Sequence, residues 1–236
     1  MTGGIDPYAD LPDLFKPLNP GDPEYPSFVG GERESPERIA ASFLEAADRL
    51  ADDWRAERER HGRELLIALP ILQTYRHAIE LILKAACLRM GKLQERTLEL
   101  GYGSKTAPND LVDVLGHTHG VAELVDLVNT LMDGLDVDRQ SSQLPDDVRE
   151  TLRFLHDVDE RGQAFRYGTH RVSRKPPVWD PIRPDEVGIY LESAVARLKD
   201  AAQLLVNGLG GYLDAYESNI NDMWSEWQNE MNGWGP

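Results

Sequence analysis

The chain has 236 residues and a formal net charge of −16, because its 41 acidic residues outnumber its 25 lysines and arginines. This charge repels phosphate, which argues against a protein that coats duplex DNA or an anionic membrane by general electrostatic attraction. A single cysteine, Cys87, excludes an internal disulfide and a thiolate cluster for zinc or iron–sulfur chemistry. The sequence shows neither a signal-peptide pattern nor an apolar run long enough for a bilayer. We therefore expect a cytoplasmic protein with no membrane partner.

Residues 1–34 are predicted to form an extended or disordered acidic arm. They hold six prolines and five glycines with acids spread between them, and proline lacks the donor that a helix or inner strand needs. Isolated apolar residues such as Leu14, Phe15 and Phe28 would let the arm lie along the rest of the protein. Free disorder is the alternative.

Helical periodicity dominates from residue 35 onward. Ser35-Pro36-Glu37 has the cap, first-turn proline and acid of a helix start. The apolar residues that follow at spacings of three or four predict one buried face, made of Ile39, Phe43, Ala46, Leu50 and Trp54. A second helix is predicted from Glu64 to Met90, kinked or split at Pro70 and ended by Gly91.

Three further helices are predicted, over 121–135, 146–161 and from Pro184 onward. The fourth helix should turn Val148, Leu152 and Leu155 inward, and glycines at 208–211 should end or interrupt the last one. No strand with period-two alternation is evident. The sequence thus predicts an all-α bundle of about five helices, with a helical domain over residues 35–213.

Residues 214–236 are predicted to be an acidic, tryptophan-rich tail. The segment has five acids, no lysine or arginine, and Trp224, Trp227 and Trp234. Such a segment either packs back on the bundle or binds a partner or a second copy.

One stretch reverses the charge of its surroundings. Residues 161–183 carry a net charge of +5, with several aromatic residues, whereas the rest of the chain sums to −21. Arginines that bind phosphates and rings that stack on bases are what recognition of single-stranded RNA requires. The alternative is a solvated loop whose arginines pair with the acidic body.

Three segments follow one another along the chain. The first contains Tyr75-Arg76-His77, Glu80-Leu81 and Leu83-Lys84. The second is Gly116-His117-Thr118-His119-Gly120-Val121, followed by Leu124. The third is Phe165-Arg166-Tyr167, followed by Gly168. Together they span about residues 64–210 and resemble the HEPN superfamily (higher eukaryotes and prokaryotes nucleotide-binding domains), in its poorly described bacterial branch, where proline is usual at the position of Gly168.

The resemblance implies a helical bundle, often a homodimer, and in many members a metal-independent ribonuclease of toxin–antitoxin, antiviral defence or stress systems. The family's catalytic signature is an arginine followed by a histidine after four to six residues. Here Arg166 and His170 enclose only three residues. Arg55 with His61 and Arg149 with His156 fit the interval, but this composition gives about that many matches by chance.

On this interpretation His170 is a general acid or base and Arg166 binds the scissile phosphate, because histidine moves protons near neutral pH and arginine stays charged. His119 and Glu80 would orient the pair. Flanking RNA would be held by a set of residues in the basic stretch, namely Tyr167, Arg171, Arg174 and Lys175. No metal or other cofactor is expected, and the partners would be RNA (tRNA or mRNA), a second copy and a regulatory protein.

Each candidate also has a structural explanation. Arg76, Glu80 and Lys84, four residues apart, fit either a surface salt ladder or a buried polar cluster. His77 and Cys87 fit packing positions. A non-catalytic adaptor or partner-binding module of the same fold is the alternative function, and a small-molecule-binding bundle is a third.

Overall fold

The computed structural model describes residues 35–61, 67–102, 107–135, 144–160, 162, 164–166, 169–174, 177–181 and 188–233. For residues 61, 169–174, 177–179 and 231–233 it describes the backbone alone. The predicted arm, residues 1–34, lies outside the described residues. Pro36–Pro236 forms one compact unit, and the description below concerns that unit.

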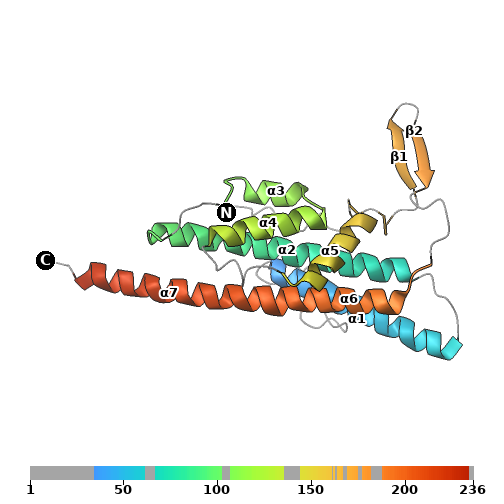
Figure 1. Cartoon of the computed structure of the whole chain (residues 1–236), viewed down its shortest axis with the longest axis horizontal. Helices are drawn as coiled ribbons and strands as arrows, with labels where there is room; N and C mark the ends of the chain where they lie inside the picture. The colour runs from blue at the N-terminus through green and yellow to red at the C-terminus, as the bar shows by residue number, and fades with distance from the viewer. Residues whose placement is uncertain are drawn as a thin grey trace, which may run out of the picture. The chain divides into compact units, whose positions relative to one another are not determined.

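The described part of the chain is almost entirely helical, which confirms the predicted all-α class. In chain order the elements are α1 (Pro36–His61), α2 (Ala68–Glu99), α3 (Leu111–His117), α4 (Val121–Gly134), α5 (Asp146–Val158), β1 (Thr169–Arg174), β2 (Pro177–Pro181), α6 (Leu191–Leu204), the π-helix η3 (Leu205–Leu209) and α7 (Gly210–Gly233) (Figure 1).

Helix α1 begins where the Ser35-Pro36-Glu37 signal predicts, but its buried face differs from the predicted one. The side chains in the core are those of Ala40, Ala47, Ala51 and Trp54, whereas Phe43 is exposed. Alanines let two helix backbones approach closely, and α1 packs most extensively against α2. The prediction followed the large apolar residues of α1. The face that contacts α2 is rotated from theirs, because it consists mainly of alanines.

Helix α2 is the central helix, in contact with α1, α3, α4, α6, η3 and α7. It starts at Ala68, so Pro70 lies in its first turn, where an amide N–H has no intrahelical acceptor, and neither kinks nor splits the helix. Gly91 does not end the helix. A Cβ there would lie 2.7 Å from Leu111 Cδ2, so this glycine makes room for α3.

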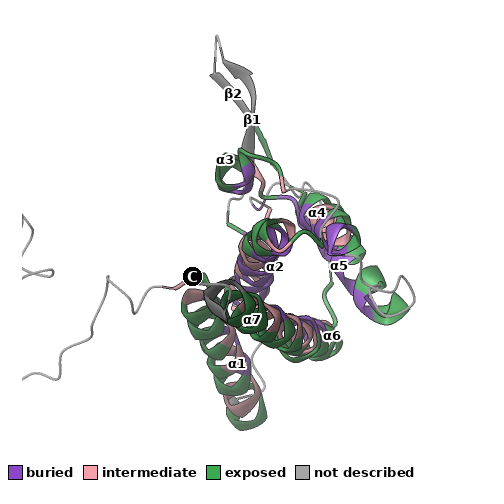
Figure 2. Ribbon diagram, turned by 90° about the vertical axis from the view of Figure 1, so that its left-hand side faces the viewer, coloured by how far each residue is buried: buried purple, intermediate pink, exposed green. Residues whose placement is uncertain are grey.

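Helices α3 and α4 each pack on α2, and α5 packs on α4 and α6 (Figures 1 and 2). The predicted bounds of α4 are confirmed to within a residue, and Val148, Leu152 and Leu155 of α5 are buried as predicted. Sequence periodicity missed α3, because seven residues are too few to establish it. In Figure 2 the buried residues gather where α2, α4, α5 and α6 face one another.

Helices α6 and α7 follow each other without a break, joined by η3 (Figure 1). The glycines at 208–211 thus interrupt the α-helical pattern with a π-helical turn but do not end the rod. Leu205, Leu209, Leu213 and Ile220 remain buried along it. The predicted tail therefore continues the helical rod as far as Gly233.

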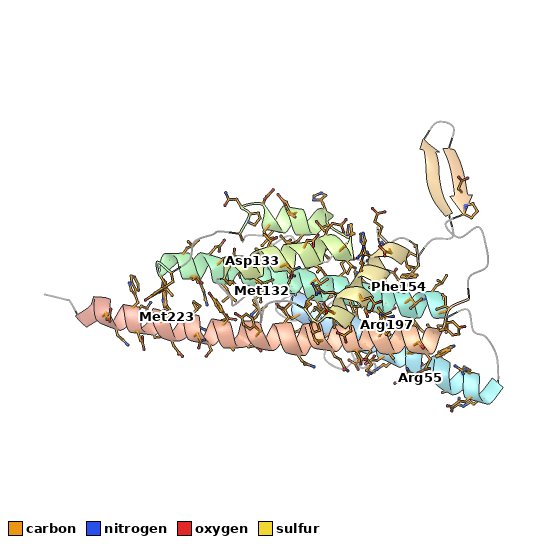
Figure 3. The ribbon with its side chains drawn as sticks, viewed as in Figure 1. Arg55, Met132, Asp133, Phe154, Arg197 and Met223 are labelled. Carbon is orange, nitrogen blue, oxygen red and sulfur yellow. The ribbon has the colours of Figure 1, made fainter. Side chains whose placement is uncertain are left out.

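Polar contacts also join neighbouring helices. Arg55 of α1 pairs with Glu192 of α6 at 2.9 Å, and Arg197 of α6 reaches Thr151 of α5 at 3.4 Å; both arginines are labelled in Figure 3. An exposed ion pair such as that of Arg55 with Glu192 stabilises a fold by about 0–1 kcal/mol. The buried apolar core supplies most of the stability.

The basic stretch contains a β-hairpin that the sequence analysis did not predict. Strands β1 and β2 pair antiparallel, with His170 opposite Asp180 and Arg171 opposite Trp179, and the register shifts between Arg171 and Ser173. Their alternation is too short and too broken by proline to show a period of two. Within this stretch, Thr169–Arg174 and Pro177–Pro181 are therefore paired strands and not part of an irregular loop. Among the helices of the described residues, none is long and apolar enough to cross a membrane.

Candidate functional site

The three charged residues spaced along α2 form a buried cluster and not a surface ladder. The exposed fractions of Arg76 and Glu80 are 1% and 4%. Isolated charges at such depth are strongly unfavourable, so each must be paired and hydrogen-bonded. We call Arg76, Glu80, Lys84, His119 and Asp159 together the Glu80 cluster.

Glu80 is held by three donors. Its Oε2 accepts from Arg76 Nη1 at 2.7 Å, and its Oε1 lies 2.9 Å from Lys84 Nζ and 3.0 Å from His119 Nδ1. Burial alone would raise the pKa of Glu80, but the hydrogen bonds from Lys84, His119 and Arg76 outweigh it and lower that pKa. Glu80 is therefore a carboxylate at neutral pH.

Arg76 connects three parts of the chain that are distant in sequence. Besides Glu80, its guanidinium pairs through Nε with Asp159 Oδ2 at 3.1 Å, just after α5. Its Nη2 donates to the backbone carbonyl of His119 at 2.5 Å, in the connection between α3 and α4. The planar, always-charged guanidinium is suited to hold several acceptors at fixed angles.

The turn after α5 lies directly on this guanidinium. Gly162 has a φ of +68°, and a Cβ at this position would lie 2.8 Å from Arg76 Nη1. Asp159 Oδ1 accepts from the Ala164 amide at 2.8 Å, which fixes the turn. Arg166, whose side chain is exposed, donates from Nε to the Gly162 carbonyl at 2.7 Å. Glycine is needed here for its backbone conformation and for the close approach.

His119 is the member of the cluster that reaches solvent, with a side chain 55% exposed. Because Glu80 is ionised and can only accept, Nδ1 of the imidazole must carry the donated proton. A neutral His119 then has its lone pair on Nε2. A buried carboxylate that fixes an exposed imidazole in this tautomer is an arrangement suited to general base catalysis.

The structure thus joins three of the four predicted catalytic residues. Glu80 and His119 are in direct contact, and Arg166 is linked to them through Gly162 and Arg76. The fourth, His170, lies in β1 with Arg171 and Arg174, where the backbone alone is described. Tyr167 and Lys175 lie outside the described residues.

Sequence reasoning missed two residues that build the site, Asp159 and Gly162. An acid followed three residues later by glycine, just past a helix, is a common helix end and gives no sign of a partner on α2. Arg76 and Lys84 were singled out by their spacing from Glu80, but the same spacing fits an exposed face equally well.

Two other predicted packing residues are in place. Cys87 is fully buried, and burial raises the pKa of its thiol to about 12, so it is not a nucleophile. The His77 ring meets Phe43 edge-on at 4.5 Å between centroids. Burial lowers the pKa of His77, although Glu80 opposes that shift. Within the described ranges no group of three or more His, Cys, Asp or Glu side chains could hold a metal ion.

Comparison with known proteins gives no match: no family model, curated protein sequence or solved structure is detectably similar to this chain.

Proposed function

We propose that this chain is an RNA-directed effector that cleaves RNA without a metal ion, in bacterial defence, a toxin–antitoxin pair or a stress response. One observation carries the proposal: a buried, ionised carboxylate, that of Glu80, holds the exposed imidazole of His119 at 3.0 Å. The basic stretch that begins beside this site would bind the RNA. The sequence resemblance to HEPN proteins supports RNA as the substrate.

The reaction would be an attack by the ribose 2′-oxygen on the neighbouring phosphate. His119 Nε2 takes the proton of the 2′-hydroxyl as the bond from O2′ to phosphorus forms. The bond from phosphorus to the 5′-oxygen breaks, and His170 in its protonated form gives that oxygen a proton. The products are a 2′,3′-cyclic phosphate and a free 5′-hydroxyl, so no oxidant or other co-reactant is needed.

The remaining residues would bind and orient. Arg166 would contact the non-bridging phosphate oxygens, where charge accumulates in the transition state. Arg171, Arg174 and Lys175 would hold flanking phosphates, and Tyr167 would stack on a base. Arg76 is a positioning residue, because it fixes both the His119 backbone and the Gly162 turn that carries Arg166.

Cleavage of total RNA and tRNA by the purified protein in EDTA tests the proposal. His119→Ala should lower the rate by about 10²–10⁴-fold, the usual contribution of a general base. His117→Ala is the matched control: this histidine lies two residues away, and its Nδ1 contacts the Asp113 carbonyl. Arg166→Ala should also lose activity, whereas Arg149→Ala, which removes an exposed arginine paired with Asp146, should not.

Each pattern of results separates the alternatives. Loss in His119→Ala and Arg166→Ala, with both controls active, supports the proposed site. Loss in His170→Ala with full activity in His119→Ala would place the chemistry in the hairpin. If the His117→Ala and His119→Ala variants lose activity equally, the histidine assignment is wrong.

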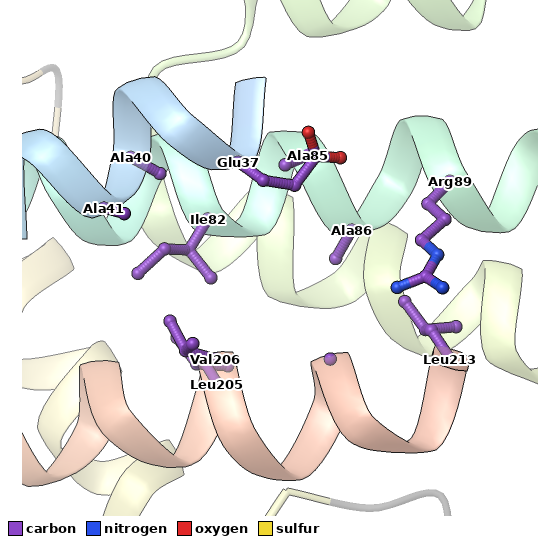
Figure 4. A pocket seen from close by; sticks show the side chains of 11 residues that line it. Glu37, Ala40, Ala41, Ile82, Ala85, Ala86, Arg89, Leu205, Val206 and Leu213 are labelled. Atoms are coloured by element: carbon purple, nitrogen blue, oxygen red, sulfur yellow. The ribbon is translucent and has the colours of Figure 1, made fainter. Parts of the chain in front are cut away.

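A non-catalytic, partner-binding module is the second candidate, and two observations favour it. First, Arg76, Glu80 and Asp159 are almost fully buried, and their contacts connect α2 to the α3–α4 connection and to the turn after α5. This structural role accounts for the buried charges without any catalysis. In addition, α1, α2 and the η3–α7 junction enclose a mostly apolar hollow of about 120 Å³, lined by Ile82, Leu205 and Leu213 and edged by Glu37 and Arg89 (Figure 4). No RNA cleavage by any form of the protein would favour this candidate.

A further inference from the structure

The C-terminal half of α7 carries an apolar stripe that the helical bundle covers only at its start. Ile220, Trp224, Trp227 and Met231 follow one another at spacings of four, three and four residues, the pattern of a helix that packs on a partner. Ile220 is buried, whereas Trp227 is 42% exposed. The rings of Trp224 and Trp227 lie 5.3 Å apart, so they form one continuous surface. Figure 1 shows α7 extending past the end of α2.

Acidic side chains flank this stripe, and among the described residues those on its distal part have no basic partner. Nearer the bundle, Asp214 and Glu217 both pair with Arg89. Farther along, Asp222, Glu226 and Glu230 are exposed and form no ion pair with any described residue. The last turn of α7 contains no basic residue. This surface combines tryptophan rings with exposed carboxylates that form no ion pair among the described residues. Such a surface is complementary to a partner that is aromatic and basic.

The same chain contains a segment with the opposite properties. Residues 161–183 carry a net charge of +5, and residues 214–236, with five acids and no lysine or arginine, carry −5. The hairpin β1–β2, residues 169–181, carries +2 of this charge, from Arg171, Arg174 and Lys175 against Asp180, and it also contains Trp179. Its two strands contact chiefly each other.

Within one chain the hairpin cannot cover the part of the stripe that lies beyond Trp224. The hairpin begins three residues after Arg166, which is fixed beside Arg76, whereas Trp224 lies with Arg96 and Glu99 at the other end of α2. Twenty residues of α-helix separate the levels of Arg76 and Arg96, a distance of about 30 Å. Three residues of extended chain after Arg166 and a strand of six residues together reach about 30 Å, so the hairpin could at most meet the level of Trp224. The distal stripe up to Met231 lies farther away still.

We propose that the C-terminal half of α7 in one copy of this protein binds the basic hairpin β1–β2 of a second copy. Each copy has one such helix and one such hairpin, and in the proposed assembly two copies exchange them reciprocally, which closes the assembly into a two-fold dimer. Pairing of two α7 helices with each other is disfavoured, since it would bring Asp222, Glu226 and Glu230 of both copies together.

The dimer has a consequence for the proposed ribonuclease, and this step rests on that proposed function. The hairpin is the segment proposed to bind RNA, so the acidic helix of the second copy occupies the place of the RNA backbone. RNA and the second copy then compete for it. Self-association would restrain the effector until RNA or another acidic ligand displaces α7.

Sedimentation analysis of the full-length protein in the absence of RNA tests the dimer. The wild-type protein should dimerise at low salt and dissociate toward 0.5 M salt, where the range of charge–charge interactions falls to about 4 Å. Glu226→Lys/Glu230→Lys and Arg171→Glu/Arg174→Glu should each weaken the dimer by about tenfold or more. The protein carrying all four changes should dimerise again.

A matched control separates this contact from the effect of net charge. Asp126→Lys/Asp133→Lys changes the net charge by the same amount as Glu226→Lys/Glu230→Lys, but at exposed positions of α4, and it should leave the dimer intact. Asp133 is labelled in Figure 3. Circular dichroism confirms that each variant is folded, and recovery in the four-fold variant excludes misfolding as the cause of loss.

Three results would overturn the inference: a monomeric wild type at low salt, a dimer that survives Arg171→Glu/Arg174→Glu, or a four-fold variant that stays monomeric while folded. Because the measurement contains no RNA, it fails or succeeds independently of ribonuclease activity. Conversely, an inactive but dimeric protein would contradict the ribonuclease and leave this interface standing.

Discussion

At the scale of single residues, the most constrained feature is the contact between Arg76 and Gly162. The guanidinium is almost fully buried, and it is paired with Glu80 and Asp159. Removing one partner from such a set usually costs about 3–5 kcal/mol, because a buried charge is left uncompensated. Gly162 contributes no side chain to the set, yet its backbone forms one wall of it.

Replacing Gly162 by alanine should therefore be unusually destabilising. Its positive φ alone costs a residue with a Cβ about 1–2 kcal/mol, and the clash with the Arg76 guanidinium adds an overpacking cost of about 1–3 kcal/mol. Gly101→Ala isolates the first effect, because Gly101 has a φ of +79° and nothing within 4 Å of the added carbon. Urea unfolding measures both variants. Equal losses of unfolding free energy would mean that the Arg76 contact contributes nothing.

At the scale of elements, close approach between helices explains the differences between predicted and observed boundaries. Gly91 looked like a helix end, but it lies inside α2, where α3 packs against it. Alanine at this position would gain about 1 kcal/mol of helix propensity. It would also meet Leu111, a buried side chain, at 2.7 Å. We expect overpacking to dominate.

The expected result for Gly91→Ala is a net loss of unfolding free energy of up to about 2 kcal/mol, the overpacking cost less the gain in helix propensity. Gly211→Ala in α7 is the control, since nothing lies within 4 Å of the added carbon, and it should stabilise the protein by up to about 1 kcal/mol. Chemical denaturation of the two variants beside the wild type decides the point. A stabilised Gly91→Ala variant would show that α3 moves away freely.

These elements also show what the sequence could and could not predict. Periodicity located α4 and α5, because each has an apolar stripe that the core buries. The Ser35-Pro36-Glu37 signal located the start of α1. It could not locate a helix of seven residues, or a buried face made of alanines. In the site, spacing placed Glu80 beside Arg76 and Lys84. The partners Asp159 and His119 come from other elements, so only tertiary packing brings them together.

At the scale of the whole molecule, the stability of the fold should fall with acid in two stages. Burial, together with Arg166, Arg76 and Lys84, lowers the pKa of His77 below the 6.5 of a free side chain, against the opposing effect of Glu80. The unfolded chain then binds a proton near pH 6.5 that the folded chain does not, so stability declines as pH falls through this value.

The second stage involves Glu80, whose pKa lies below its ordinary 4.5 in the folded protein because hydrogen bonds from Lys84, His119 and Arg76 outweigh desolvation. Its stabilising contribution is fully present above pH 4.5 and is lost as pH falls through the folded pKa.

Unfolding free energies from urea titrations between pH 8 and pH 3.5 report both stages. His77→Gln should flatten the first stage and leave the second. Glu80→Gln, which lowers stability at neutral pH, should come closest to the wild type at the acid end. If the unfolding free energies of the wild type and the His77→Gln variant run parallel across pH 5.5–7.5, the first stage does not belong to His77. If Glu80→Gln is less stable than the wild type by the same free energy at every pH, the second stage does not belong to Glu80.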